Sequence, residues 1–257
     1  MQIIIPMAGL GERFKFAGYK DPKPLIPIDG KPVIEHIVNL FAPEDTFLFI
    51  CNENHLRDTN MKEEILRIRP DAKIVSIKEH YLGPVYTTMQ AKEFIRDDEP
   101  ALTCYCDINV DWDYNHFKTQ MKEREADSAV IAFKGFHPPL LQEGFYATAR
   151  VNENNEVLEV REKHSFTPNK MDSWTSAGMH YFRRGEFIKK YFEQMMERQM
   201  LCNKEYYISL SHNLLIEAGL KNVIYPVDYF ISWGKPADVQ EYQYWSKHFN
   251  KIDDDKN

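Results

Sequence analysis

The sequence predicts an α/β fold, in which a Rossmann-like, mostly parallel sheet is flanked by helices and carries an antiparallel addition. Its 257 residues suit one large α/β domain. In the first half, apolar runs of strand length alternate with helical segments, as right-handed crossovers between parallel strands require. After about Phe133, several strand-like segments follow closely on one another, which favours antiparallel pairing.

The strands expected in the first half are short apolar runs, typical of strands covered on both faces. They span residues 2–6, 46–52, 72–77, 101–107 and 127–133. Helices are expected between them over 31–41, 63–68 and 83–95. Proline stands in the first turn of the first and third of these helices, where its missing N–H costs least.

The second half is expected to place strands at 145–151, 156–163, 173–182 and 222–228. Its helices are expected over 184–198, over 205–219 and over 235–249. Gly219 suits the end of the second of these helices, because glycine accepts the left-handed backbone of a helix C-terminus. The last residues, 251–257, are expected to form a flexible tail.

Composition and charge exclude several classes of protein. The net charge is −7 and there is no long basic block, which disfavours a nucleic-acid surface or an anionic membrane patch. The four cysteines form no C-x-x-C pair, so no zinc knuckle or thioredoxin-like motif is indicated, and Cys104 and Cys106 are expected to be buried thiols. No stretch resembles a signal peptide or a membrane span, which predicts a cytoplasmic protein.

The loop after the first strand, "PMAGLGERFKFAGYKDPKPLI", has the chemistry of a triphosphate site. Gly9 and Gly11 allow backbone N–H groups to approach an anion closely. Arg13 has a planar fork for phosphate oxygens, and Lys23 is restricted by a proline on each side. The third glycine of a dinucleotide motif and the G-K-[ST] of a P-loop are both absent. A glycine turn with a solvated Arg and Lys is the plain alternative.

The same segment resembles a known signature. "PMAGLGERF…PKPLIPIDGKPVIEHIV" is similar to the G-x-G-x-R, K-P and G-K-P motifs of the sugar-phosphate nucleotidyltransferases, which have a GT-A-like NTP transferase fold. The resemblance implies a nucleotide-binding half, 1–134, and an antiparallel acceptor-binding half, 135–250, in one domain over 1–250. It also implies attack by an acceptor phosphate on the α-phosphorus of a nucleoside triphosphate, with release of pyrophosphate.

The resemblance implies roles for the opening loop and for a second segment, "KEHYLGPVYTTMQ", which is similar to the family's base-binding loop. Arg13 would contact the leaving phosphates and Lys23 would stabilise the α-phosphate in the transition state. For His80, a surface histidine is the favoured interpretation. The nucleotide-binding residues that the resemblance implies are Met7, Ala8, Gly9, Gly11, Glu12, His80, Gly83 and Thr87.

The family reaction needs a divalent cation, Mg²⁺ or Mn²⁺. In "CYCDINVDWD", Asp107 ends a predicted strand and is similar to the family's metal ligand, with a turn cap as the alternative. Asp111 and Asp113 are better read as turn and N-cap residues.

A late family motif, D-hydrophobic-G-T-P, often supplies a second metal carboxylate. Here the matching segment is "SWGKPADVQEY", in which Lys235 replaces Thr and Ser232 stands where Asp is expected. Asp228 is the nearest carboxylate upstream and is the alternative second ligand.

Acceptor binding is implied for the second half. "EVLEVREKHSF" resembles the family's V-E-K segment with Glu162 and Lys163 in place, and Lys163 would bind the acceptor phosphate. "TSAGMHYF" resembles an N-A-G strand, where Ser176 replaces Asn and Gly178 would let the acceptor approach the backbone. Glu205 is similar to an acidic residue that precedes a family helix. Solvated ion pairs, a strand glycine and a helix-terminal acid are the plain alternatives.

The predicted function is nucleotidyl transfer to a phosphorylated acceptor, either a sugar phosphate or a small metabolite such as phosphoglutamine. The serine and lysine departures favour a divergent cytidylyltransferase that uses CTP for capsule or surface polysaccharide biosynthesis, while uridylyl and thymidylyl transfer stay open. One alternative is a GT-A glycosyltransferase that uses Asp111-Trp112-Asp113 as a D-x-D metal motif. Another is a catalytically inactive nucleotide-binding regulator. Homo-oligomer formation is left open.

Overall fold

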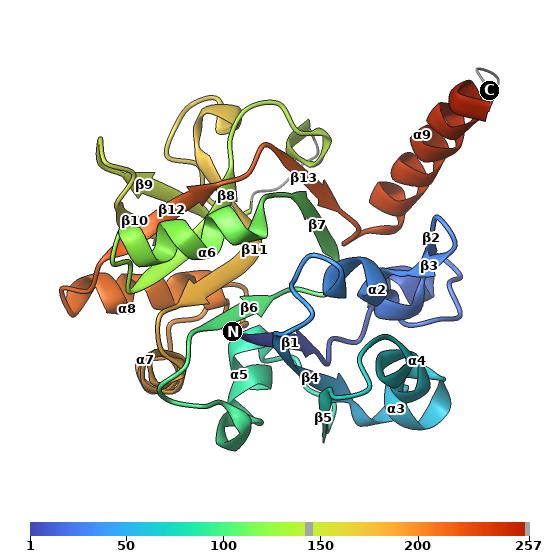
Figure 1. The fold of residues 1–257 in the computed structure, drawn as a ribbon, viewed down its shortest axis with the longest axis horizontal. Helices are drawn as coiled ribbons and strands as arrows, with labels where there is room; N and C mark the ends of the chain where they lie inside the picture. The colour runs from blue at the N-terminus through green and yellow to red at the C-terminus, as the bar shows by residue number, and fades with distance from the viewer. Residues whose placement is uncertain (142–145, 255–257) are drawn as a thin grey trace.

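A mixed sheet of nine strands forms the centre of the molecule (Figure 1). This computed structural model describes residues 1–141 and 146–254, with side chains to residue 250. The strands run in the order β10-β9-β11-β6-β1-β4-β5, and β8 joins β11 to β12. Their bounds are β1 (Gln2–Met7), β4 (Thr46–Asn52), β5 (Lys73–Ile77), β6 (Ala101–Cys104), β8 (Ser128–Phe133), β9 (Thr148–Val151), β10 (Val157–Arg161), β11 (Trp174–Phe182) and β12 (Asn222–Pro226).

The pairing confirms the predicted fold class. β1 lies between β4 and β6 with parallel register on both sides, and β4 pairs in parallel with β5. β11 runs antiparallel to β6, β8 and β9, so the antiparallel part begins where the second half of the chain joins the sheet. The sheet is therefore continuous between the two halves, although the predicted division at residue 134 stays a prediction.

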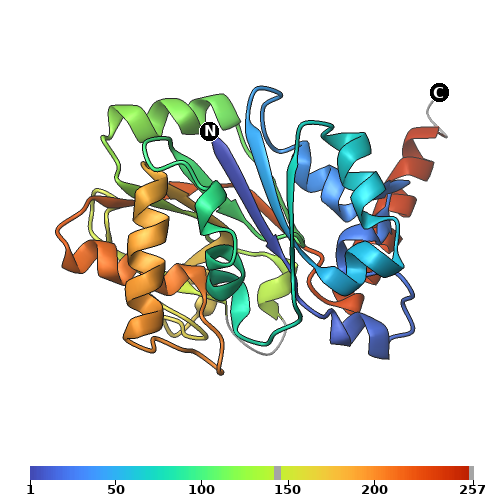
Figure 2. The ribbon, with the colours of Figure 1, turned by 90° about the horizontal axis from the view of Figure 1, so that it is seen from below.

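Helices cover both faces of the sheet (Figure 2). Ile3 and Ile5 of β1 pack with α2, α4 and α6, whereas Ile4 packs with α5, α7 and α8, as alternation along a strand requires. The helices are α1 (Glu12–Phe16), α2 (Val33–Val38), α3 (Glu53–Asp58), α4 (Met61–Ile68), α5 (Gly83–Met89), α6 (Tyr114–Glu123), α7 (Gly185–Glu197), α8 (Ser211–Glu217) and α9 (Pro236–Asp254).

Two short ribbons lie outside the main sheet. β2 (Pro27–Ile28) pairs with β3 (Lys31–Pro32), and β7 (Ile108–Asp111) pairs with β13 (Tyr229–Ser232) in antiparallel register. Ser232 lies opposite Ile108 in the second ribbon. This pairing, which the sequence did not predict, carries the segment that follows Ser232 next to the turn that holds Asp107.

Several predicted boundaries are wrong. The helix expected over 205–219 starts later than predicted. A 3-10 turn spans Ile208–Leu210 and α8 follows it, whereas residues 205–207 are not helical. The helix expected over 83–95 ends at Met89. The last helix continues to Asp254, into the predicted tail. Gly219 does follow α8 with a positive φ of 74°, and Asp113 does cap α6 by accepting from the His116 N–H at 2.8 Å.

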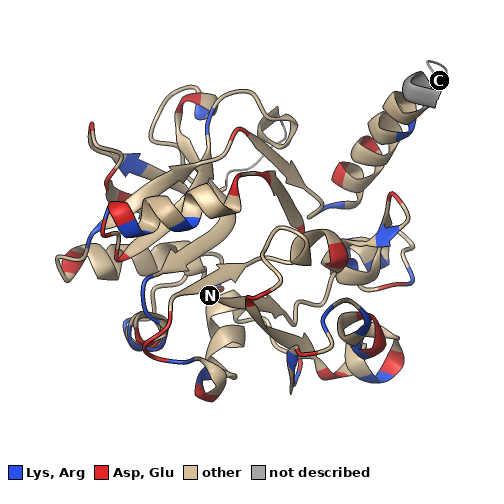
Figure 3. Cartoon of the chain, in the orientation of Figure 1, with Lys and Arg blue, Asp and Glu red and all other residues tan. Residues whose placement is uncertain are grey.

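The distribution of charged side chains and the burial of the cysteines agree with what the sequence predicts. In the view of Figure 3, acidic and basic side chains of the described residues are interspersed over the outer elements without a broad basic face. Cys51, Cys104 and Cys106 are buried, and burial raises the pKa of each thiol above its ordinary value. Among the residues that the structure describes, we find no helix with the length and apolar character needed to cross a membrane.

Candidate active site

Two adjoining cavities open at the carboxyl ends of β1 and β6, the edge where parallel sheets bind ligands. The first cavity, of about 450 Å³, is lined by the opening loop and by residues 80–87. The second cavity, of about 360 Å³, is lined mainly by the second half of the chain. The wall that both cavities share consists of Arg13, Tyr105, Asp107, Lys163, Tyr207 and Gly234.

The glycines of the opening loop lie on the wall of the first cavity. Gly11 precedes α1 with a φ of 64°, a left-handed conformation that disfavours other residues, and a Cβ there would have open space around it. Glycine is therefore required at position 11 by the left-handed backbone conformation and not by a lack of space for a side chain. Met7, Gly9 and Glu12 also line the cavity, whereas Ala8 is buried behind them.

Lys23 and Asp107 form an ion pair beside the shared wall. Their Nζ and Oδ2 atoms are 2.7 Å apart, and the two side chains are 22% and 18% exposed. Lys23 begins a 3-10 turn between its two prolines, and Asp107 lies in the turn between β6 and β7. Burial lowers the pKa of Lys23, but the adjacent carboxylate of Asp107 more than offsets this and leaves the pKa raised. Lys23 is therefore held as a cation next to the opening loop, on the wall of the first cavity.

His80 has both ring nitrogens engaged within its own loop. Nδ1 accepts from the Leu82 N–H at 3.1 Å, so the proton of the neutral ring is on Nε2, which lies 3.0 Å from Thr87 Oγ1. The Thr87 hydroxyl donates in turn to the Gly83 carbonyl at 3.1 Å. Burial lowers the pKa of His80, in agreement with a neutral ring. His80 and Thr87 line the first cavity, and their mutual contacts shape the loop that faces it.

Gly83 is required by close backbone contact. Its φ is 85°, and a Cβ would lie 2.9 Å from the carbonyl oxygen of Tyr206. The backbone of Tyr206 bonds to both sides of Gly83, donating to Leu82 and accepting from Val85. This contact brings Glu205 to the first cavity, where it lines the wall. Glu205 does not line the second cavity, where the other predicted acceptor residues lie, and its role toward the acceptor stays a prediction.

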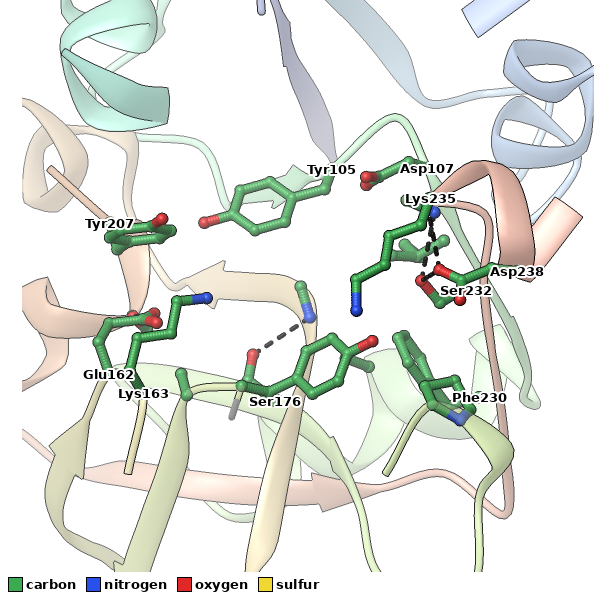
Figure 4. A pocket seen from close by; sticks show the side chains of 18 of the residues that line it. Tyr105, Asp107, Glu162, Lys163, Ser176, Tyr207, Phe230, Ser232, Lys235 and Asp238 are labelled. Carbon is green, nitrogen blue, oxygen red and sulfur yellow. Dashed lines mark hydrogen bonds between the residues drawn. The ribbon is translucent and has the colours of Figure 1, made fainter. Parts of the chain in front are cut away.

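The second cavity collects the other predicted acceptor residues (Figure 4). Glu162 accepts a short hydrogen bond from the Ser209 hydroxyl, and burial raises the pKa of this carboxyl group. The amino group of Lys163 lies 5.2 Å from the centre of the Tyr207 ring. Ser176 Oγ accepts from the Gly178 N–H at 3.1 Å. All four predicted residues, Glu162, Lys163, Ser176 and Gly178, therefore line one cavity.

Glycine at position 178 is required by a neighbouring aromatic ring. Gly178 has a φ of 79°, and a Cβ would lie 2.8 Å from Cδ2 of Tyr105. Its carbonyl oxygen also accepts from the Tyr105 N–H at 3.1 Å. Gly178 thus makes room for the aromatic ring of Tyr105, which lines both cavities, and the sequence motif gave no sign of this ring.

Sequence reasoning missed several residues of the site. Tyr105 and Tyr207 belong to the shared wall, and Lys235 and Asp238 line the second cavity. Asp238 is 6% exposed and accepts from both Ser232 Oγ and the Lys235 N–H at 3.1 Å. Its place three residues after the start of the predicted last helix was the available signal, because an acidic residue there reaches back to the helix N-terminus.

Asp111 and Asp113 do not contribute to either cavity. Asp113 caps α6, and Asp111 is exposed at the end of β7. The spacing that suggested a D-x-D metal motif is therefore explained by a strand end and a helix cap.

The family model of the MobA-like NTP transferase domain matches residues 3–167, which cover the opening loop, the first cavity and the Glu162–Lys163 pair. The chain belongs to this family. This family agrees with the NTP transferase resemblance that the opening loop carries. The curated relatives include the bifunctional protein GlmU of Methanocaldococcus jannaschii, 27% identical over 243 residues that cover 94% of this chain and 53% of the relative. The chain spans about half, or less, of the length of the curated relatives it matches.

Solved structures show the same nucleotidyltransferase fold over nearly the whole chain. A nucleoside-diphosphate-sugar pyrophosphorylase from Vibrio cholerae RC9 is 21% identical with a TM-score of 0.77, and the match covers 94% of this chain and 99% of that one. An inositol-1-phosphate CTP transferase from T. maritima is 17% identical with a TM-score of 0.69, covering 96% and 95%. At these identities the likeness establishes the fold.

The cation that the nucleotidyltransferase family implies fits Asp107. This carboxylate is partly exposed at the shared wall, and Gly234 leaves space beside it, since a Cβ there would lie 3.0 Å from Asp107 Oδ2. Mg²⁺ is commonly held by one or two carboxylates together with substrate phosphates. Within the described residues there is no group of three or more metal-binding side chains.

Asp228 does not belong with Asp107. It is exposed, precedes β13, and lines neither cavity. Because β13 runs from Tyr229 to Ser232, and Ser232 lies next to the Asp107 turn, Asp228 is at the far end of the ribbon. We therefore remove Asp228 from the candidate metal ligands.

Proposed function

We propose that this chain transfers a nucleoside monophosphate from a nucleoside triphosphate to a phosphorylated acceptor and releases pyrophosphate. The observation that carries the proposal is the wall common to the two cavities. A nucleotide in the first cavity and an acceptor in the second would meet at this wall, where Arg13, Asp107 and Lys163 lie and Lys23 is paired beside it.

In the proposed reaction, an oxygen of the acceptor phosphate forms a bond to the α-phosphorus while the bond from that phosphorus to the bridging oxygen of the β-phosphate breaks. Pyrophosphate leaves with the electron pair. The protein's part is to orient the two phosphates and to neutralise charge. Lys23 would face the α-phosphate, Arg13 the leaving phosphates and Lys163 the acceptor phosphate. A divalent cation held by Asp107 would supply further neutralisation of phosphate charge.

We propose CTP as the nucleotide and capsule or surface polysaccharide biosynthesis as the role. The support is the set of departures from the family motifs at Ser176, Ser232 and Lys235, all of which line the second cavity. An acceptor such as phosphoglutamine or a sugar phosphate fits this proposal. The similar solved structures include a CTP transferase and UDP-glucose pyrophosphorylases, so the base must be tested directly. Cytoplasmic location and homo-oligomer formation stay predictions.

The test is an assay of pyrophosphate release with CTP, UTP, dTTP, ATP and GTP, each against a panel of sugar and amino-acid phosphates, with Mg²⁺ or Mn²⁺ present. Acceptor-dependent release with at least one pair is expected, fastest with CTP. If no pair releases pyrophosphate although nucleoside triphosphates bind, the regulator hypothesis replaces the proposal. Faster release with another base would retain nucleotidyl transfer and remove the CTP assignment.

A further inference from the structure

A third cavity, of about 590 Å³, lies at the opposite end of β6 from the two cavities of the candidate active site. Pro100, which precedes the first residue of β6, lines this cavity, whereas Tyr105, which follows the last residue, lines the other two. The described residues that line the third cavity line neither of the others. The proposed nucleotidyl transfer therefore makes no use of the third cavity.

The walls of the third cavity come largely from α6 and from the end of β11. Lys118 lies three residues before Met121 and four before Lys122, so the three side chains share one face of α6. Tyr181 lies near the end of β11, and Arg183 directly follows this strand. Met121 is buried and forms an apolar part of the wall. Cationic and apolar groups therefore face the same space.

Tyr181 brings a hydroxyl group without a protein partner to this cavity. The side chain is 5% exposed, and its ring packs edge-on against Phe117 of α6 with 5.6 Å between the ring centres. Within the described part of the chain, no protein group forms a hydrogen bond with the Tyr181 hydroxyl. The buried side-chain atoms that lack a hydrogen bond there belong to His55, Arg184 and Trp233. The Tyr181 hydroxyl is not among these atoms, so it is reached from the cavity and can donate to a ligand.

Cationic groups outnumber acidic groups in the lining of the third cavity. The cations are Lys118, Lys122 and Arg183, and Glu125 is the one acidic residue among the described residues that line it. The amino group of Lys122 makes no ion pair with any residue that the structure describes. The charge of the lining therefore favours an anionic ligand.

The other two cations form ion pairs at the surface. Lys118 Nζ lies 3.2 Å from Glu44 Oε1, and the Glu44 side chain is 68% exposed. Arg183 Nη1 lies 3.5 Å from Asp127 Oδ1, and the Arg183 side chain is 52% exposed. Ion pairs of exposed side chains are weak, because water competes for both charges. An anion in the cavity can therefore compete with these carboxylates for the two cations.

We infer that the third cavity binds a small organic anion, in which a phosphate or carboxylate group is joined to an apolar body. Arg183 and Lys122 bind the anionic group, and the Tyr181 hydroxyl donates a hydrogen bond to it. The apolar body contacts Pro100 and Met121, whose flexible thioether side chain adapts to ligands of varied shape. This site does not depend on the proposed function, and it binds its ligand whether or not a nucleotide is present.

The experiment compares phenyl phosphate, benzoate, inorganic phosphate and the neutral compound benzamide. Binding to the full chain is followed by NMR of isotope-labelled methionine methyl groups, because Met121 lines the third cavity and Met7 lines the first. Phenyl phosphate or benzoate should shift the Met121 resonance in a saturable way, equally with and without a non-hydrolysable CTP analogue. The tighter of the two identifies the anionic group as a phosphate or a carboxylate.

The remaining two probes separate the contributions of charge and of apolar contact. Inorganic phosphate should bind to the third cavity about tenfold more weakly than phenyl phosphate, because it buries no apolar surface. Benzamide has an apolar ring but no charge, and it should leave the Met121 resonance in place.

Tyr181→Phe and Arg183→Gln test the two proposed contacts to the anionic group. Each should weaken binding of the tighter anion at Met121 about tenfold, as the loss of a charge-assisted hydrogen bond predicts. Because the Tyr181 hydroxyl has no partner in the described part of the chain, Tyr181→Phe should melt at the wild-type temperature. Tyr244→Phe and Arg57→Gln make the same changes at exposed positions away from the three cavities and should leave binding unchanged.

The inference is wrong if neither anion shifts the Met121 resonance at millimolar concentration. It is also wrong if benzamide binds as tightly as the anions, or if either Tyr181→Phe or Arg183→Gln binds the anion as the wild type does. Pyrophosphate release plays no part in these measurements. A failure of the proposed function and a failure of this site are therefore seen in different experiments.

Discussion

At the scale of single residues, Lys23 is the side chain with the most direct expected effect on turnover. In the free protein its amino group is bonded to Asp107 at 2.7 Å, and both side chains remain partly exposed. An incoming phosphate can compete for the same amino group, since the site is open to the first cavity. The ion pair thus holds the lysine in place before the nucleotide binds, which reduces the entropy lost in the transition state.

Lys23→Ala is expected to lower kcat about a hundredfold to a thousandfold, because it removes a cation directed at developing phosphate charge. Binding of the nucleoside triphosphate, measured by calorimetry, should change far less. Lys20→Ala changes an exposed lysine in the same loop that lines neither cavity, and it should behave as the wild type. Undiminished turnover in Lys23→Ala, with the control intact, would remove Lys23 from the catalytic residues.

Site residues whose conformation depends on their neighbours in the sequence could be predicted. Site residues that are placed by tertiary contacts could not. Gly11 and Lys23 were predicted from short motifs, because their neighbours along the chain determine their conformation. The places of Asp238 and Glu205 in the site depend on which loops meet in the folded protein. A β7–β13 ribbon brings Asp238 to the Asp107 turn, and a contact with Gly83 brings Glu205 to the first cavity.

At the scale of elements, a buried series of polar side chains on two strands and a helix leads away from the second cavity. His180 of β11 lines the cavity, and its Nδ1 lies 3.0 Å from Nε2 of His212 on α8. His212 Nδ1 lies 2.8 Å from Oδ1 of Asn222 on β12. The Asn222 amide group donates to the Leu220 carbonyl, so Oδ1 is left to accept from His212. His180 therefore donates from Nδ1 and presents Nε2 as an acceptor.

These hydrogen bonds require the imidazole rings of His180 and His212 to be neutral. Burial of the two rings keeps them neutral. Burial lowers the pKa of His212 to about 4, and burial together with the neighbouring His212 lowers the pKa of His180 well below its ordinary value. In the unfolded chain each ring binds a proton near pH 6.5. Unfolding therefore takes up protons between about pH 4 and 6.5, and the free energy of unfolding should fall as the pH decreases through this range.

His212→Gln should reduce this pH dependence. One neutral imidazole contributes about 1 kcal/mol to the fall in the free energy of unfolding between pH 7.5 and 5.5, so the variant should show a fall smaller by about that amount in urea titrations. His248→Gln, which alters an exposed histidine on α9, should keep the wild-type dependence. The same dependence in both variants would contradict a neutral, buried His212.

Helices and strands could be predicted from the sequence where the pattern of apolar residues within the segment determines its structure. β1, β4 and β11 are long buried runs and were expected at nearly their observed positions. The helix expected from residue 205 failed because the backbone of Tyr206 bonds to Leu82 and Val85, a tertiary contact that competes with helical hydrogen bonds. The short β7 and β13 strands exist only because they pair with each other.

At the scale of the whole molecule, the order of strands explains why two cavities share a wall. β6 lies between the parallel strand β1 and the antiparallel strand β11, so its carboxyl end borders both halves of the chain. The turn after β6 carries Tyr105 and Asp107, and both belong to the shared wall. The wall residues are thus fixed by the joint between the two parts of the sheet, while the other lining residues differ between the two cavities.

This arrangement predicts that the two substrates can be weakened separately. Thr87 lines only the first cavity and Ser176 only the second, and replacing either by valine removes one hydroxyl group. Thr87→Val should raise KM for the nucleoside triphosphate about fivefold to tenfold, by releasing His80 from its loop, and Ser176→Val should raise KM for the acceptor similarly. Both KM values are measured from the rate of pyrophosphate release at varied concentrations of each substrate. If each variant raised both constants equally, the two cavities would act as one site, and the assignment of a nucleotide side and an acceptor side would be wrong.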